Sequence, residues 1–173
     1  MRLMERMFQL RPNRKPEVAK RISNREEDAY LNLKAHGLSD TTAAAIMGNM
    51  RQEENAFNPY SVDSGALGMF QLKGAKRKAY QDYINEYDLD DSSANQIDFM
   101  VDTIYDNYKG KLPKDKQLVG HGTTRKIRKS FDNDDVAAQT KTFDDKWERS
   151  GGKELKERQS YAAEYLKSIL GSY

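Results

Sequence analysis

The chain has 173 residues and a formal net charge of +2, with 29 Lys and Arg against 27 Asp and Glu. This length fits one domain, and 37% hydrophobic residues, including ten tyrosines and six phenylalanines, argue against a disordered chain. The absence of cysteine excludes disulfides and thiolate chemistry, and no apolar run reaches the roughly 18 residues of a membrane span. His36 and His121 have no cysteine or second histidine nearby, so we expect no metal site and no cofactor.

The positive charge is concentrated at the amino terminus. Residues 1–21 carry seven Lys or Arg and two Glu. Pro12 and Pro16 interrupt any helix there, so we expect residues 1–22 to form a basic arm and residues 23–173 to form the folded domain. The first residues contain no continuous apolar segment, and we therefore expect no secretory signal.

Two helices are predicted at the start of the domain. The motif Ser-Asn-Arg-Glu at residues 23–26 is a capping-box pattern, and a helical stripe of apolar residues follows it up to Gly37. A second helix is predicted over residues 38–54, with Ser39 or Asp40 as its cap. Its expected buried stripe consists of Ala43, Ile46, Met47 and Met50.

The rest of the domain combines a loop region with further helices. Pro59, Gly65 and Gly68 predict loops between residues 55 and 73, with room for a short β-hairpin. A basic, glycine-containing stretch over residues 109–129 predicts a long connection. Apolar residues at helical spacing predict helices over residues 79–87, 97–108, 133–147 (capped by Asn133 or Asp134, with Trp147 in the core) and 154–170. The predicted fold is mainly α, with a small hairpin or irregular insert after the second helix.

The second helix ends in two adjacent glutamates, Glu53 and Glu54. On a helical wheel Glu54 falls near the middle of the predicted buried stripe, and Glu53 lies at its edge beside Asn49. A poorly solvated carboxyl group has a raised pKa and can give its proton to a leaving oxygen, as cleavage of a glycosidic bond requires. Spacing alone fits equally a surface pair that ends an amphipathic helix.

The stretch NPYSVDSGALGMFQLKGAKR, residues 58–77, contains groups that suit a saccharide site. Asn58 begins a turn, Gln71 can both donate and accept hydrogen bonds, and Tyr60 or Phe70 offers an aromatic face. Loops commonly contain such residues, so these features do not identify a site by themselves.

Together with the preceding helix, this stretch resembles the phage tail lysozyme family, whose members are tail-associated peptidoglycan hydrolases with a lysozyme-like fold. Weaker similarity continues in NQIDFMVDTIYDNY and in AAQTKTFDDKWERSGG followed by ERQSYAAEYL, so the resemblance covers about residues 24–170. The matching positions are Gly48, Asn49 and Glu53, then Asn58 and Pro59, then Ala66, Gly68 and Gln71, and finally Gly74 and Arg77.

The resemblance implies a lysozyme-like helical domain that cleaves the β-1,4 bond between N-acetylmuramic acid and N-acetylglucosamine. Glu53 would be the general acid, and Gln71, Asn58 and Tyr60 would contact the substrate. The resemblance implies a protein of the virion tail that acts on the host cell wall during genome entry. We expect it to be made in the host cytoplasm without a signal peptide. The expected partners are peptidoglycan glycan strands and other tail proteins, and the basic arm would contact the tail proteins. We expect no membrane span and no binding to a specific nucleic acid.

Two departures from the family pattern affect this assignment. Glu54 stands where the family usually has serine, and one extra residue precedes Asn58. The spacing from Gly48 selects Glu53, whereas the spacing back from Pro59 selects Glu54; because insertions are tolerated more easily in loops than in helices, we choose Glu53. In addition, Leu72 replaces a tryptophan of the family.

A second carboxylate is available in Asp63. It could activate water as a general base opposite Glu53, or it could be a turn residue that bonds its own backbone. Without it, the enzyme could act as a lytic transglycosylase, in which the 6-hydroxyl of the sugar attacks. Two functions without glycosidase chemistry also fit the sequence. One is an inactive structural or adaptor protein of the tail, and the second is a nucleic-acid-binding domain that uses the basic arm and the basic segment at residues 125–129.

Overall fold

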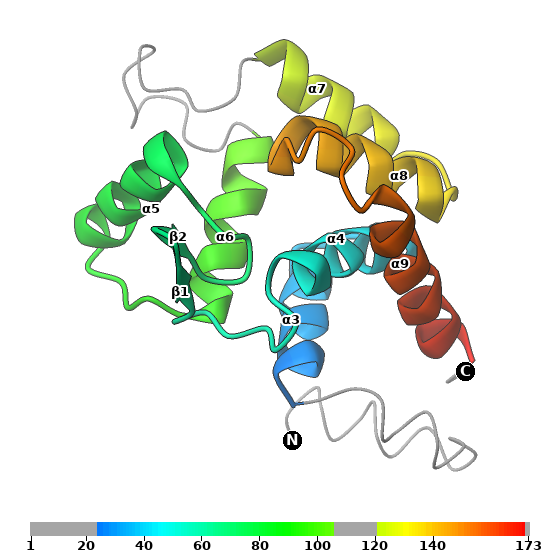
Figure 1. The fold of residues 1–173 in the computed structure, drawn as a ribbon, viewed down its shortest axis with the longest axis horizontal. Helices are drawn as coiled ribbons and strands as arrows, with labels where there is room; N and C mark the ends of the chain where they lie inside the picture. Colours follow the sequence, from blue (N-terminus) through cyan, green and yellow to red (C-terminus); the bar gives the residue numbers. More distant parts are fainter. Residues whose placement is uncertain (1–23, 106–120, 172–173) are drawn as a thin grey trace.

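The structure, a computed structural model, describes residues 24–105 and 121–171. The predicted mainly helical domain with a small hairpin after the second helix is confirmed (Figure 1). Its elements are α3 (Asn24–Ala35), α4 (Asp40–Glu53), β1 (Val62–Asp63), β2 (Ala66–Leu67), α5 (Gly74–Glu86), α6 (Ser93–Ile104), α7 (His121–Ser130), α8 (Val136–Phe143), the π-helix η2 (Asp144–Glu148) and α9 (Leu155–Leu170).

Helix α4 lies at the centre of the domain and packs against α3, α8 and α9 (Figure 1). Ser39 caps it, since the serine Oγ accepts a hydrogen bond of 3.1 Å from the Thr42 amide. The four residues of the predicted stripe are buried, but every other residue from 41 to 50 is buried as well, so burial is not confined to one face of the helix. The helix ends at Glu53, and Glu54 has an extended backbone, so a helical wheel cannot compare the burial of the two glutamates.

Gly48 allows α4 and α9 to approach closely. A Cβ atom at this position would lie 2.6 Å from the carbonyl oxygen of Arg158 and 2.7 Å from the Cβ of Ala162. Such distances are far inside van der Waals contact, so only glycine fits at this helix crossing.

Gly48→Ala is therefore expected to destabilise the domain by about 1–3 kcal/mol, because the added methyl group forces two packed backbones apart. Urea unfolding followed by circular dichroism measures the change. Gly122→Ala in α7 is the matched control: no atom of the described residues lies within 4 Å of the added atom, so this change is expected to be neutral or slightly stabilising. Equal effects of the two substitutions would contradict the close helix crossing.

We name residues 59–72, which contain β1 and β2, the hairpin segment. Gln96 of α6 binds this segment through hydrogen bonds. Strands β1 and β2 pair antiparallel, and the Gln96 side chain of α6 is fully buried. Its amide nitrogen donates to the Pro59 carbonyl oxygen at 2.8 Å, and its amide oxygen accepts from the Met69 amide at 3.0 Å. Gly68 has φ +71, and a Cβ there would overlap the Gln96 amide. One glutamine side chain thus joins both ends of the loop that carries the hairpin.

Trp147 is the largest fully buried side chain and packs near aromatic rings from three parts of the fold. Its ring centroid lies 6.3 Å from that of Phe70, 6.4 Å from that of Phe99 and 6.1 Å from that of Phe143. These rings come from the hairpin segment, α6 and α8, so the tryptophan connects all three. Its predicted place in the core is confirmed.

Some predicted boundaries are wrong. The connection expected over residues 109–129 contains helix α7 from residue 121 onward, while residues 106–120 lie outside the described part of the chain. Asp135, rather than Asn133 or Asp134, caps α8 by accepting from the Ala138 amide at 3.0 Å. The basic arm also lies outside the described residues. No helix of the described segments combines the length and the apolar character that crossing a membrane requires.

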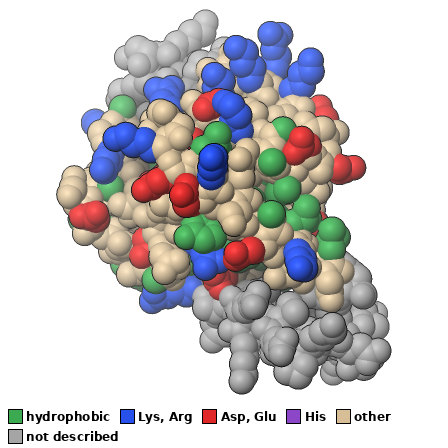
Figure 2. All heavy atoms as spheres, turned by 45° about the vertical axis from the view of Figure 1, so that its right-hand side comes forward, with side chains coloured by type: hydrophobic (Ala, Val, Ile, Leu, Met, Phe, Trp, Pro, Cys, Tyr) green, Lys and Arg blue, Asp and Glu red, His purple; other side chains and the backbone are tan. Residues whose placement is uncertain are grey.

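Helix α7 carries the basic segment on its solvent side. Arg125, Lys126 and Lys129 are exposed, and Lys and Arg side chains gather along the upper edge of the face in Figure 2. Ile127 and Thr124, in contrast, are fully buried. An amphipathic helix with a solvated basic face accounts for this charge run without a specific ligand.

Candidate active site

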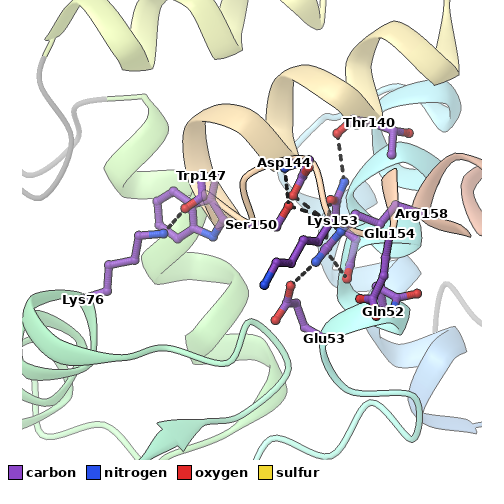
Figure 3. A network of polar contacts seen from close by, with 12 residues as sticks. Gln52, Glu53, Lys76, Thr140, Asp144, Trp147, Ser150, Lys153, Glu154 and Arg158 are labelled. Atoms are coloured by element: carbon purple, nitrogen blue, oxygen red, sulfur yellow. Dashed lines mark hydrogen bonds and ion pairs between the residues drawn. The ribbon is translucent and has the colours of Figure 1, made fainter. Parts of the chain in front are cut away.

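Glu53 is the last residue of α4 and is held by Arg158 of α9. The glutamate Oε1 accepts a hydrogen bond from the Arg158 Nη2, and the two side chains point toward one another in Figure 3. The Glu53 side chain is 22% exposed, whereas that of Arg158 is 3% exposed. The carboxylate therefore lies at the boundary between solvent and a buried guanidinium group.

Asn49 orients this arginine from one turn earlier in α4. Its Oδ1 accepts a hydrogen bond of 3.3 Å from the Arg158 Nη1, so a second nitrogen of the guanidinium group is bound. The asparagine nitrogen donates to the carbonyl oxygens of Ala45 at 3.0 Å and Thr140 at 3.2 Å. A single buried side chain thus links α4, α8 and α9 directly beneath Glu53.

The π-helix η2 supplies two more carboxyl groups. Its defining bond runs from the Arg149 amide to the Asp144 carbonyl oxygen at 2.6 Å, and Arg149 ends it with a left-handed backbone. Asp144 is fully buried, and its Oδ1 lies 3.4 Å from the Arg158 Nε. Neither of its carboxylate oxygens forms a hydrogen bond with another described residue. Single π-turns within helices are frequent at functional sites.

Glu148 is the last residue of η2, and its Oε1 is shielded from solvent without a hydrogen-bond partner among the described residues. Burial raises the pKa of this carboxyl to about 8, and the nearby charge of Glu53 acts in the same direction. The cations Lys76 and Arg158 oppose this shift and Asp144 adds to it. The surroundings of Glu148 therefore favour the protonated form of its carboxyl group.

Lys76 reaches the same place from α5. Its ammonium group donates to the Trp147 carbonyl oxygen and lies 4.7 Å from the centroid of the indole ring (Figure 3). Burial lowers the pKa of Lys76, while the charges of Glu148 and Glu53 act in the opposite direction. We name the group of Glu53, Lys76, Asp144, Glu148 and Arg158 the charge cluster.

Glu54 has different surroundings from its neighbour. Its Oε2 accepts from the Asn58 amide at 2.5 Å, and the Asn58 Oδ1 accepts from the Tyr60 amide at 3.2 Å. These bonds organise the loop that follows α4, and they leave the Tyr60 ring 62% exposed. Glu54 therefore shapes the loop, whereas Glu53 belongs to the charge cluster.

Asp63 and Gln71, which the sequence also predicts as site residues, lie on the hairpin segment. Asp63 is exposed in β1 and accepts from the Ser64 hydroxyl at 3.1 Å. Gln71 has φ +45 and donates through its side chain to the Gly68 carbonyl oxygen at 2.8 Å. No hydrogen bond or ion pair among the described residues joins either of them to Glu53. The structure thus places Asn58, Tyr60 and Gln71 in loops and Asp63 in the exposed strand β1, and the roles of all four in binding or catalysis stay predictions.

A comparison with models of known protein families shows the family of this chain. The family model described as phage tail lysozyme matches residues 24–169, which is most of the sequence. The chain belongs to the phage tail lysozyme family. No curated protein and no solved structure matches it. The mainly helical fold with its short hairpin is the lysozyme-like fold that the resemblance implied.

The segments that carried the resemblance to the phage tail lysozymes have clear structural tasks. Gly48 allows the approach of α9, and Asn49 positions Arg158. Gln96 fastens the hairpin segment to α6. In the final segment, Arg158 holds Glu53, and Ala162 packs against Gly48.

Sequence reasoning missed four members of the charge cluster: Lys76, Asp144, Glu148 and Arg158. The available signal was the pattern Trp-Glu-Arg at residues 147–149, where charged residues directly follow a buried aromatic one. Arg158 and Asp144 resembled ordinary helix-surface charges until the helices were placed together. Among the residues that the structure describes, no three His, Asp or Glu are arranged to hold a metal ion.

Proposed function

We propose that the protein is a peptidoglycan glycosidase of a phage virion, which cleaves the β-1,4 bond between N-acetylmuramic acid and N-acetylglucosamine. Membership of the phage tail lysozyme family supports a tail-associated lysozyme-like protein. Its work would be local opening of the host cell wall while the genome enters, with the basic arm at residues 1–22 docking to neighbouring tail proteins. It would be made in the host cytoplasm and carried to the wall in the tail.

The observation that carries this proposal is the position of Glu53. The residue ends the central helix at the spacing of the family motif, and its carboxylate is both partly exposed and held in one orientation by Arg158. A general acid needs this combination of substrate access and fixed geometry. The Glu54 carboxylate, by contrast, accepts a hydrogen bond from the backbone amide of Asn58 in the following loop.

The reaction balances with one carboxyl group as the acid. Glu53 gives its proton to the glycosidic oxygen as the bond from that oxygen to C1 breaks and its electron pair moves to the oxygen. Water then adds to C1 and releases a proton that restores the acid. Asp63 is the candidate base for this water, and Asn58, Tyr60 and Gln71 are the candidate substrate contacts, since all four lie in the segment between α4 and α5.

The test is digestion of purified peptidoglycan with the full chain, followed by mass spectrometry of the glycan fragments. Hydrolysis yields intact reducing-end sugars. Lytic transglycosylation, the alternative reaction that needs no second carboxylate, yields anhydro sugars that are one water lighter. Absence of fragments would contradict the proposal and support an inactive structural or adaptor protein.

A further inference from the structure

Arg158 has two carboxylate partners, and they differ in their exposure to solvent. Its Nη2 donates to the Glu53 Oε1, and its Nε lies 3.4 Å from the Asp144 Oδ1. The Glu53 side chain is partly exposed, whereas the Asp144 side chain is fully buried. One partner of the arginine can therefore reach a substrate, and the other stays inside the protein.

The polar contacts of the Arg158 guanidinium group fix its orientation. Asn49 accepts from Nη1 through its Oδ1 at 3.3 Å and through its backbone carbonyl oxygen at 3.4 Å. Asp144 approaches Nε from η2, and Glu53 meets Nη2 from α4 (Figure 3). Because the guanidinium group is planar and its N–H groups have fixed directions, partners at Nε and Nη1 also set the direction of Nη2. Asp144 thus takes part in aiming the N–H group that holds Glu53.

The countercharge of Arg158 matters for the acid step. A general acid carries its proton before the reaction begins, and protonated Glu53 supplies no negative charge to the arginine. A buried charge that has lost its partner strongly destabilises a protein. The Asp144 carboxylate lies beside Arg158 independently of the proton on Glu53, so the arginine keeps a partner in both states of the acid.

We propose that Asp144 is a positioning residue for the acid step: it supplies the countercharge of Arg158 while Glu53 holds the proton that goes to the glycosidic oxygen. After the transfer, ionised Glu53 pairs with Arg158 again, and the proton released by the attacking water restores the acid. Asp144 does not touch the substrate, and it acts through Arg158. The inference rests on the proposed function, because it assigns Asp144 a part in the reaction of Glu53.

Other charged groups surround the pair of Glu53 and Arg158. They are Lys76 of α5, Asp144 and Glu148 of η2, and Arg149 directly after η2. With Arg149 counted, three carboxylates face three cations, so the group is balanced when all six are ionised. Among the described residues, Asp144 lies within ion-pair distance of Arg158, and no ion pair or hydrogen bond joins Glu148 to it. Asp144 is therefore the buried carboxylate that compensates this arginine.

The countercharge can be tested without any activity measurement. Glu53→Gln imitates the uncharged acid, and with Asp144 in place its equilibrium constant of unfolding is expected to stay within about tenfold of wild type. Urea unfolding of the full chain measures it. An increase of more than about a hundredfold, typical of a buried charge without a partner, would overturn the inference.

The double variant Asp144→Asn/Glu53→Gln removes both countercharges of Arg158. Each amide keeps nearly the shape of the carboxyl group that it replaces, so the loss of charge is the main change. Each single variant retains one carboxylate beside the arginine, and the double variant retains neither. Its unfolding constant is therefore expected to exceed the product of the two single effects by about tenfold or more. Effects that simply multiply would overturn the inference.

The kinetic test is the pH profile of peptidoglycan cleavage. Asp144→Asn is expected to move its alkaline limb to lower pH by about one unit or more, because Arg158 then favours the ionised form of Glu53 more strongly. KM should stay near the wild-type value, since Asp144 is fully buried. A purely structural role would lower the stability and leave the limb in place.

Asp145→Asn is the matched control for the kinetic test. Asp145 is the next residue of η2, and its carboxylate pairs with Lys141 at the surface of α8. This variant makes the same chemical change one position along the chain and should leave the alkaline limb in place. A shift as large as that of Asp144→Asn would overturn the specific role of Asp144.

The two levels of the proposal fail separately. An unchanged alkaline limb in folded Asp144→Asn would overturn the role of Asp144 while the glycosidase activity stood. If Asp144→Asn does not fold, the unfolding of Glu53→Gln decides the question by itself. A wild-type protein that cleaves no peptidoglycan would refute the proposed function, and the unfolding measurements would still decide whether the two carboxylates share Arg158.

Discussion

Glu53→Gln is expected to lower the rate of peptidoglycan cleavage by about 10²- to 10⁴-fold, the usual contribution of a general acid. The amide cannot give a proton to the leaving oxygen. It can still accept the hydrogen bond from Arg158 through its oxygen, so the helix packing survives. The rate is measured as release of soluble glycan fragments, and near-wild-type circular dichroism and melting temperature show that folding is not the cause.

Glu54→Gln is the matched comparison, since it changes the adjacent residue in the same way. Its amide oxygen can keep the bond from the Asn58 amide, so the loop retains its shape and activity should stay within a few-fold of wild type. Loss of activity in Glu54→Gln together with full activity in Glu53→Gln would reverse the assignment. The extra residue before Asn58 would then have shifted the catalytic position along the chain.

Arg158→Met is expected to destabilise the domain by about 3–5 kcal/mol, the usual cost of removing one partner from a buried ion pair. The substitution leaves Asp144 fully buried without its cation and frees Glu53 from its only described partner. Methionine retains an apolar stem of similar length, so lost packing contributes little. Urea unfolding at neutral pH measures the effect.

Arg125→Met provides the control for this experiment. Arg125 is exposed on α7, and surface substitutions of this kind usually change the unfolding free energy by less than about 0.5 kcal/mol. A penalty that is equally small for both variants would contradict a buried charge cluster.

The helices were predictable because their signals are local. Apolar spacing, the Ser39 cap and the glycine-rich hairpin segment specify structure within a few residues, and the structure agrees with them. The end of α8 was not predictable in this way. Apolar spacing predicted one helix through Trp147, whereas the chain forms a π-turn from Asp144 that local propensity does not encode.

The candidate site was predicted only in part, for a physical reason. Glu53 was found through its motif, but the side chains that surround it come from α5, η2 and α9, as far away as residue 158. Their relation depends on tertiary packing, above all on the close approach that Gly48 permits. The helical wheel placed Glu53 at the edge of an apolar stripe beside Asn49, and it gave no sign of the Arg158 guanidinium group that donates to Glu53.

The central claim is that this chain adds water across a glycosidic bond of peptidoglycan through Glu53. The most direct measurement is digestion of peptidoglycan in ¹⁸O-labelled water by the wild type and by Glu53→Gln, with mass spectrometry of the fragments. The claim predicts one ¹⁸O atom in the new reducing-end sugar for the wild type, and almost no fragments for the variant. Fragments that form equally with Glu53→Gln, or a wild type that releases none, would contradict it.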